Sequence, residues 1–429
     1  MFRNILVPIV ICMFAAVLTS GNNPIKGHPL YVNPSFQEEL DTSIQSATGA
    51  VKKTLQSMRD TASAYWLDVR AKIKGSGTPG ETTTMEGILQ DAASKTPVPL
   101  VTLIVYDLPN RDCHARASNG ELCCTYKDDG TCDYTAPGDC AEGLETYKKE
   151  YIDPLVEILS QYQDRVPIVL VIEPDSLPNL ATNMANPRCG SPATVNAYRT
   201  GISYAVDQIA THTPQVTMYL DAAHGGWLGW DNSMDVFIET MTKLDVLSKV
   251  KGFATNTANY QPVGIQCPYY DYCRGGANAG APCCEDPCDL ITQYNYGNNE
   301  LNYVLFLHNK TVEAVPGFDP TFIIDTGRNG VVNMRKSCSN WCNIRNAGVG
   351  RNPTTDTKVA IVDAYLWLKT PGESDGCTNT LPDGTQCPRY DSMCGSVDSI
   401  GSELGEPRAP EAGGWFEYQV KQLAANVAE

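Results

Sequence analysis

Two carboxylates directly follow the most apolar run of the sequence. Residues 166–172 read VPIVLVI, and Glu173, Pro174 and Asp175 come next. A buried strand that ends in an acid can hold it in surroundings of low polarity, where the pKa of the carboxyl group rises. This arrangement suits general acid catalysis, in which a carboxyl group keeps its proton until it donates it to a reacting atom.

Polar side chains of similar type follow the other apolar runs. Asp and Asn at such places often cap helices, and a cap is the simpler explanation for any one of them. For the whole set a shared cleft is favoured, because several tryptophans stand close to the same places. The polar residues are Asp68, Asp107, Asp112, Asp221, His224, Asn256, Asn259, Asp325, Arg328, Lys369, Glu373 and Asp375, and the tryptophans are Trp66, Trp227, Trp230 and Trp341.

Carboxylates beside tryptophans are typical of carbohydrate sites. Sugars stack their C–H faces on aromatic rings, and their hydroxyl groups bond to acid, amide, Lys and His side chains. Glycoside hydrolysis needs one protonated acid near the leaving oxygen and a second carboxylate beyond the sugar ring. It needs no metal and no organic cofactor. The sequence has no G-x-S-x-G elbow and no phosphate-binding glycine motif, which argues against a serine hydrolase or a nucleotide-dependent enzyme.

Strand-type runs alternate with helix-type segments along the chain. Fully apolar strands in such alternation predict one parallel sheet covered by helices, an α/β fold of about seven strands. The carboxyl ends of parallel barrel strands converge on one face, so the polar residues above are expected to meet there. The predicted strands lie within residues 65–71, 99–109, 166–175, 216–227, 251–260, 320–330 and 358–376, and the predicted helices within 150–163, 197–212, 233–250, 299–315 and 414–427.

Charge and the N-terminus restrict partners and location. The chain of 429 residues has 32 Lys and Arg against 49 Asp and Glu, a formal charge of −17. This balance argues against nucleic acid or an anionic membrane as partner, although the acidity could also serve solubility alone. Arg3 precedes an apolar run too short to span a bilayer, so residues 1–21 are predicted to be a signal peptide. Residues 22–429 would form one secreted, monomeric catalytic domain without a separate carbohydrate-binding module.

The cysteines predict disulfide bonds in loops. Of 17 cysteines, Cys12 falls in the predicted signal peptide, which leaves 16, an even number. In an exported protein such a set indicates disulfides. A metal site is the alternative, since CC steps occur twice, but of five histidines only His114 lies near the cysteines. Asn309, in the sequence NKT, is a glycan acceptor candidate.

Several motifs resemble those of glycoside hydrolase family 6. Residues 105–113 (VYDLPNRDC) and 169–178 (VLVIEPDSLP) resemble its two signature motifs. The likeness extends over nearly the whole predicted mature chain, through 219–230 (YLDAAHGGWLGW), 252–260 (GFATNTANY), 322–330 (FIIDTGRNG), 339–343 (SNWCN) and 368–376 (LKTPGESDG). The resemblance implies a secreted, inverting β-1,4-glucanase with a single distorted parallel barrel of about seven strands.

The resemblance also implies roles for individual residues. Asp175 matches the general acid, Asp112 the aspartate that raises its pKa, and Asp375 the residue proposed as base. Asp112 with Ser118 offers an alternative route for the proton through water. Tyr106 matches a tyrosine that crowds the sugar ring, Asp221 an acid near the sugar with a structural or charge-tuning role, and Glu173 is expected to anchor the turn. Trp230 either lines a product subsite or packs. The matched sugar-binding residues are Trp66, Asp68, His224, Trp227, Asn259, Trp341, Lys369 and Glu373, and the implied disulfides are Cys113–Cys189 and Cys342–Cys394.

Two long loops predict how the cleft is closed. The loop after Asp112 and the segment between Lys369 and Trp415 are both long and rich in cysteine. Such loops would cover the cleft and form a tunnel, as in the cellobiohydrolases of the family, which release cellobiose from the non-reducing ends of cellulose. The alternatives are an endo-β-1,4-glucanase on the same scaffold and a non-catalytic β-glucan-binding wall protein.

Overall fold

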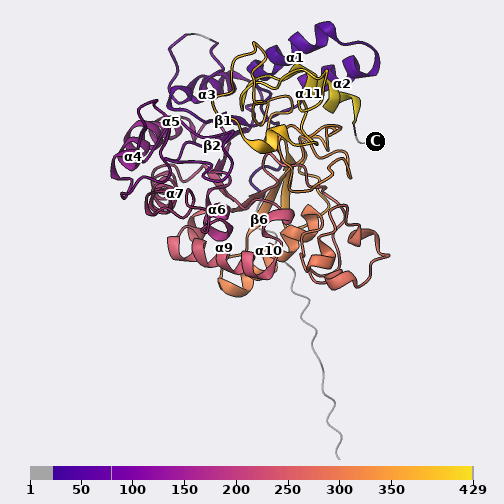
Figure 1. The fold of residues 1–429 in the computed structure, drawn as a ribbon. Helices are drawn as coiled ribbons and strands as arrows, with labels where there is room; N and C mark the ends of the chain where they lie inside the picture. Colours follow the sequence, from indigo (N-terminus) through magenta and orange to yellow (C-terminus); the bar gives the residue numbers. More distant parts are fainter. Residues whose placement is uncertain (1–22, 79, 428–429) are drawn as a thin grey trace, which may run out of the picture.

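The computed structural model describes residues 23–78 and 80–427 (Figure 1). The predicted signal peptide, residues 1–21, lies outside the described residues. Within them, no helix has the length and apolar character needed to cross a bilayer.

Seven parallel strands form one curled sheet whose order follows the chain, which confirms the predicted α/β fold. Among the described residues no ladder pairs the first strand with the last, so the barrel is open there. Two hydrogen bonds still draw these edges together: Ala64 N–H donates to Trp367 O (2.8 Å) and Trp66 Nε1 donates to Leu368 O (2.8 Å). The strands are β1 (Tyr65–Leu67), β2 (Val101–Val105), β3 (Ile168–Ile172), β4 (Thr217–Asp221), β5 (Gly252–Thr255), β6 (Thr321–Asp325) and β7 (Val362–Leu366).

Helices cover the outside of the sheet (Figure 1), so β2 to β7 are buried along almost their whole length. The inside of the barrel holds a smaller apolar cluster that includes Ile104, Val171 and Tyr219. The α-helices are α1 (Pro34–Ser46), α2 (Gly49–Arg59), α3 (Met85–Ser94), α4 (Ala141–Thr146), α5 (Asp153–Tyr162), α6 (Ser176–Thr182), α7 (Pro192–His212), α8 (Gly225–Leu228), α9 (Asp231–Leu244), α10 (Glu300–Ala314) and α11 (Glu417–Ala425). A π-helical turn, η2 (Tyr147–Ile152), joins α4 to α5.

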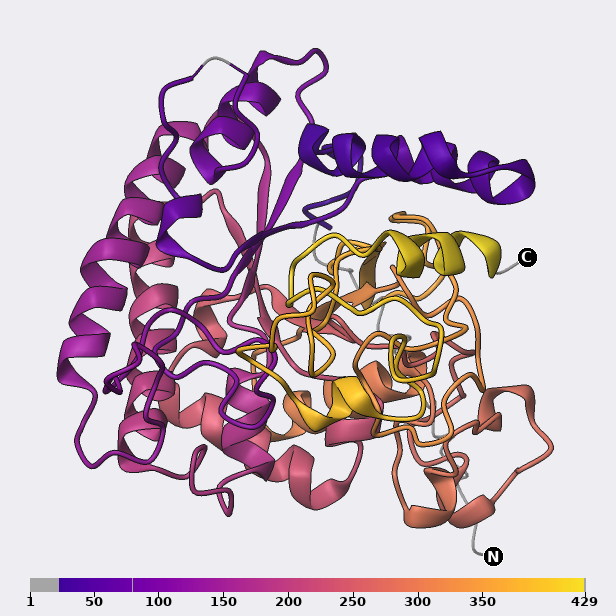
Figure 2. The same ribbon diagram turned by 45° about the horizontal axis from the view of Figure 1, so that its top comes forward.

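The two ends of the described chain pack together. Figure 2 shows α1 and α2 beside α11, and Phe36, Leu40 and Leu55 share a buried cluster with Val420 and Leu423. The pattern of the sequence did not predict α1, α2 or α3. Helices so short are stabilised chiefly by tertiary packing.

Two predicted elements end earlier than their sequence patterns suggest. The helix predicted over 233–250 stops at Leu244, because Asp245 adopts a left-handed conformation (φ 54°). The strand predicted within 358–376 is confined to Val362–Leu366. Beyond it, the N–H groups of Leu368 and Lys369 donate to the Asp325 carboxylate (3.2 and 2.9 Å), so this side chain replaces the next step of the ladder.

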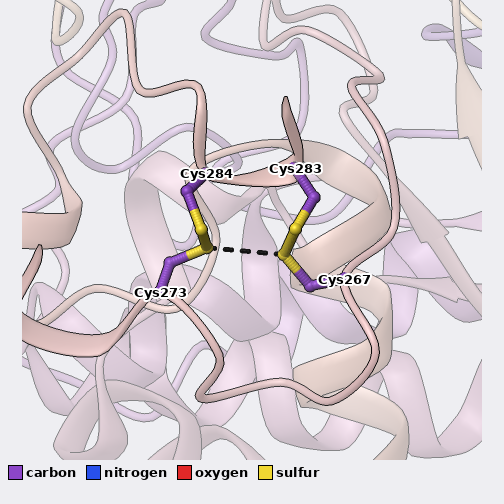
Figure 3. A group of neighbouring side chains, drawn as sticks. All are labelled: Cys267, Cys273, Cys283 and Cys284. Atoms are coloured by element: carbon purple, nitrogen blue, oxygen red, sulfur yellow. Dashed lines mark hydrogen bonds between the residues drawn. A yellow bond between two sulfur atoms is a disulfide. The ribbon is translucent and has the colours of Figure 1, made fainter. Parts of the chain in front are cut away.

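Eight disulfides staple the loops, and they use all 16 cysteines of the described chain. The two implied pairs, Cys113–Cys189 and Cys342–Cys394, both form. Figure 3 shows two neighbouring bridges whose four sulfur atoms lie close enough together to hold a metal ion, but they are paired as disulfides. The remaining pairs are Cys123–Cys132, Cys124–Cys140, Cys267–Cys283, Cys273–Cys284, Cys288–Cys338 and Cys377–Cys387.

Candidate active site

A cleft of about 460 Å³ opens at the carboxyl ends of the strands. The structure brings almost the whole predicted set of site residues to its walls. Those that line it are Trp66, Asp68, Tyr106, Asp112, Ser118, Asp175, His224, Trp227, Asn259, Trp341, Lys369, Glu373 and Asp375, together with Trp230. Asp221 is the exception: it is buried and does not line the cleft.

Asp175 stands between β3 and α6, half-buried on the wall of the cleft. Its backbone is left-handed (φ 66°), a conformation that Asp and Asn tolerate better than most residues. None of the described residues donates a hydrogen bond to its carboxyl group. Burial raises the pKa of Asp175 well above its ordinary value, and the nearby charges of Asp112 and Asp221 raise it further. The side chain therefore keeps its proton and can donate it into the cleft.

Asp112 is the neighbouring carboxylate. It is buried, its Oδ2 accepts a hydrogen bond from Tyr106 Oη, and its Oδ1 has no protein donor among the described residues. Burial raises the pKa of Asp112 to about 6, while the Tyr106 hydroxyl, the Arg111 guanidinium and Ser118 oppose the rise. These donors stabilise the charged form of Asp112, whereas the carboxyl group of Asp175 has no donor among the described residues. The arrangement therefore favours the proton on Asp175 and the negative charge on Asp112.

Asp221 supports Asp175 from below. Its Oδ2 accepts hydrogen bonds from Asp175 N–H (3.0 Å) and Ala223 N–H (3.1 Å). Burial raises the pKa of Asp221 to about 6. The carboxylate thus holds the backbone of Asp175 in place, and its charge helps to raise the pKa of Asp175.

Glu173 anchors the turn, as predicted. Its carboxylate accepts hydrogen bonds from Asp107 N–H (3.2 Å), Leu108 N–H (3.3 Å) and the Tyr147 hydroxyl (2.7 Å). It is 1% exposed and does not line the cleft. Glu173 therefore ties the end of β3 to the end of β2, which places Asp175 and the loop carrying Asp112 on one rigid support.

Asp375 differs from the other acids because it belongs to a buried ion pair. Arg328 Nη1 lies 2.8 Å from both of its carboxylate oxygens. Oδ2 also accepts from the Tyr260 hydroxyl (2.9 Å) and from Asn343 N–H (2.8 Å). Asp375 lines the cleft, and both of its carboxylate oxygens are already engaged by these donors.

The indole N–H groups of two tryptophans of the cleft bond to the protein. Trp66 Nε1 donates to a backbone carbonyl, and Trp227 Nε1 donates to Thr182 Oγ1 (2.7 Å). The Tyr106 ring stands edge-on to Trp66, with ring centres 5.0 Å apart. Lys369 Nζ lies 5.4 Å from the Trp66 ring centre and bonds to Glu373 (3.2 Å). Paired in this way, these groups offer stacking faces beside charged hydrogen-bonding groups.

His224 is a neutral polar group in the same wall. Burial, together with the charge of Arg335, lowers the pKa of His224 to about 3. Its Nδ1 has no protein partner among the described residues. A neutral imidazole in the wall can hydrogen-bond to a sugar hydroxyl without adding charge to the cleft.

Two loops meet beside the cleft. Arg116 N–H donates to Asp391 Oδ2 (2.8 Å), and Arg389 Nη1 donates to Asn119 O (2.8 Å). Both loops line the cleft, the first with His114 and Ser118 and the second with Arg389 and Met393. Hydrogen bonds between the loops therefore join the two walls.

Several contributors were not singled out from the sequence. Arg111 lies in the first signature motif and places its guanidinium 4.4 Å from the Tyr106 ring centre, so the motif could have revealed it. Arg328 was among the polar residues expected at the strand ends, but its pairing with Asp375 depends on the fold. Arg335 donates to Gln261 Oε1 (3.2 Å), and Arg389 lies in a loop without a recognisable pattern; neither carried a sequence signal.

Comparisons with known proteins agree with this geometry. The profile described as "Glycosyl hydrolases family 6" matches residues 25–427. The chain is 36% identical over 423 residues to 1,4-beta-D-glucan cellobiohydrolase C of Emericella nidulans, covering 95% of this chain and 79% of the relative. It is 33% identical over 414 residues to Exoglucanase 3 of Agaricus bisporus, covering 95% and 80%.

Solved structures of the family share the fold. The catalytic core domain of the cellobiohydrolase Cel6A from Chaetomium thermophilum superposes with a TM-score of 0.74 at 31% identity, over 94% of this chain and 98% of that one. A family 6 enzyme from Coprinopsis cinerea gives 0.73 at 32% identity, over 95% and 99%. The profile match, the identity over nearly the whole chain and the shared fold lead to one conclusion: the chain belongs to glycosyl hydrolase family 6.

Proposed function

We propose that this glycoside hydrolase is a secreted, inverting cellobiohydrolase, which cleaves β-1,4-glucosidic bonds of cellulose and releases cellobiose from non-reducing chain ends. The observation that carries the proposal is Asp175, an acid with a raised pKa and no protein hydrogen-bond donor, on the wall of a cleft lined with tryptophans. The relatives named as cellobiohydrolases support the substrate. The eight disulfides support an extracellular location, because such bonds persist in oxidising surroundings.

In the proposed mechanism, Asp175 gives its proton to the glycosidic oxygen as the bond to the anomeric carbon breaks. A water molecule attacks that carbon from the opposite face, which inverts its configuration. The proton released by this water passes through a second water beside Ser118 to Asp112, whose Oδ1 is free to accept it. Asp375 acts instead through charge and position, since Arg328 and Tyr260 occupy its oxygens.

Hydrogen bonds between the two loops support attack from chain ends. The contacts Arg116–Asp391 and Arg389–Asn119 join the loops beside the cleft. Cys377–Cys387 and Cys342–Cys394 stiffen the second loop, and Cys113–Cys189 secures the first. Loops joined in this way would admit a chain end more readily than the middle of a long chain.

The products of cellohexaose hydrolysis test the proposal. We expect cellobiose units as the main early products, and the newly formed reducing ends should be α-anomers, because inversion of a β-linkage yields them. Rapid chromatography with anomer resolution measures both. Newly formed β-anomers would overturn the inverting mechanism. A fall in the viscosity of carboxymethylcellulose as fast as sugar release would point to an endoglucanase instead.

Asp112→Asn is expected to move the high-pH limb of the pH profile to lower pH. The negative charge of Asp112 helps to raise the pKa of Asp175. Without this charge, Asp175 loses its proton at lower pH, and kcat/KM falls earlier as pH increases. The measurement is kcat/KM on cellohexaose across the pH range, and kcat is also expected to fall because the proton acceptor is lost.

Asp128→Asn is the matched control. It removes one charge from an exposed position of the same loop, where solvent screens it. Its profile should coincide with that of the parent enzyme. An Asp112→Asn profile with an unshifted high-pH limb would remove Asp112 from the explanation of the Asp175 pKa.

A further inference from the structure

Residues 265–298, between β5 and α10, form a protruding segment that we call the Cys-rich lobe. It projects at the lower right of Figures 1 and 2. Cys267–Cys283 and Cys273–Cys284 stiffen it internally (Figure 3). Cys288–Cys338 ties it to the neighbouring loop, and Cys338 itself lines the cleft. The lobe is thus covalently joined to the wall of the active-site cleft.

A hydrogen bond also joins the lobe to Trp230 in the cleft wall. Trp230 lines the cleft, and its Nε1 donates to the backbone carbonyl of Gln293 in the lobe (3.0 Å). The next residue is Tyr294, which does not line the cleft itself. Tyr294 is therefore one residue away from the backbone group that bonds to Trp230.

Tyr294 has two features that a surface tyrosine does not need. Its side chain is 60% exposed, and its backbone is left-handed (φ 60°, ψ 29°), a conformation that is rare for a bulky residue. Its ring rests against Gly275, where an added Cβ would lie 3.3 Å from Tyr294 Cε1. Strained positions of this kind persist where surrounding structure imposes them, often beside ligands. The disulfides of the lobe supply that support.

From this continuity we infer that Tyr294 is a stacking platform for the glucan chain where it extends past Trp230 and out of the cleft. The inference rests on the proposed function and adds a sugar-binding position to the same site. A neutral polysaccharide fits the surroundings, because the chain has a formal charge of −17 and the lobe carries Glu285, Asp286 and Asp289. An anionic polymer would be repelled there.

The test compares two substitutions at this position. Tyr294→Asn removes the ring but keeps a residue that tolerates the left-handed backbone, whereas Tyr294→Phe keeps the ring. In the Asp175→Asn background, which prevents hydrolysis, adsorption to insoluble cellulose is measured as Kd. We expect Tyr294→Asn to raise Kd by about fivefold, since ring stacking contributes about 1 kcal/mol. Tyr294→Phe should stay close to the parent.

A comparison of a long and a short substrate in the active enzyme separates ring stacking from indirect effects of the substitution. The ratio of activity on insoluble cellulose to kcat/KM on cellotetraose should fall by about fivefold in Tyr294→Asn, because a short chain makes fewer contacts beyond Trp230. Tyr418→Asn, at an exposed tyrosine of α11, is the remote control and should alter neither value. An unchanged Kd, or an equal loss on both substrates, would overturn the inference. A parent enzyme that cleaves no β-1,4-glucan would instead overturn the proposed function.

Discussion

Asp175→Asn is expected to lower kcat on cellooligosaccharides by about 10³-fold, within the range that general acid catalysis contributes. The asparagine has the same shape and tolerates the left-handed backbone (φ 66°), but it has no acidic proton to give. Substrate binding should persist, because the ring faces of Trp66 and Trp227 are untouched. Steady-state kinetics and binding titration with cellotetraose measure the two effects separately.

A substrate with a good leaving group isolates the missing proton. On 2,4-dinitrophenyl β-cellobioside the departing phenolate needs little protonation, so Asp175→Asn should lose much less activity than on cellotetraose. The free energy of unfolding should not fall, since the substitution removes a carboxyl group whose charged form burial disfavours. Equal losses on both substrates would remove Asp175 from the role of general acid.

Arg328→Met is expected to lower the free energy of unfolding by about 3–5 kcal/mol, because breaking a buried ion pair leaves an uncompensated charge. Arg328 is 1% exposed and Asp375 7% exposed. Besides Asp375, the guanidinium binds the Tyr260 hydroxyl (2.8 Å) and the Ala258 carbonyl (2.7 Å). Urea unfolding at pH 7, followed by two spectroscopic probes, measures the loss. Activity should fall as well, because Asp375 lines the cleft.

Two further variants serve as controls for Arg328→Met. Arg328→Met with Asp375→Asn should recover part of the lost stability, since no buried charge is then left alone. Lys421→Met, which breaks the exposed pair with Glu417, should cost less than about 1 kcal/mol. If Arg328→Met lowered the free energy of unfolding as little as Lys421→Met does, the buried pair would not be what stabilises this side of the cleft.

Much of the site could be predicted because its residues are local to strand ends. The apolar run before Glu173 predicted β3, and Asp175 follows it directly, so its position on the cleft wall depends on few residues. Asp112 was predicted in the same way from the first signature motif, and Trp66 was predicted from its place in the first strand and from the family resemblance. The exact ends of elements were less predictable: the Asp325 carboxylate ends β7, and nothing near Leu368 in the sequence indicates this contact.

The sequence by itself determined the parallel sheet, the polar residues at its carboxyl edge and the even set of cysteines, because periodicity and composition are properties of short segments. Only the tertiary structure decided that Asp221 lies beneath Asp175, that Arg328 engages Asp375, and that Cys288 joins Cys338. It also decided that Gln293, the neighbour of Tyr294 in the chain, accepts a hydrogen bond from Trp230. These contacts join residues far apart along the chain, so their distances, burial and pKa values exist only once the sheet has brought the loops together.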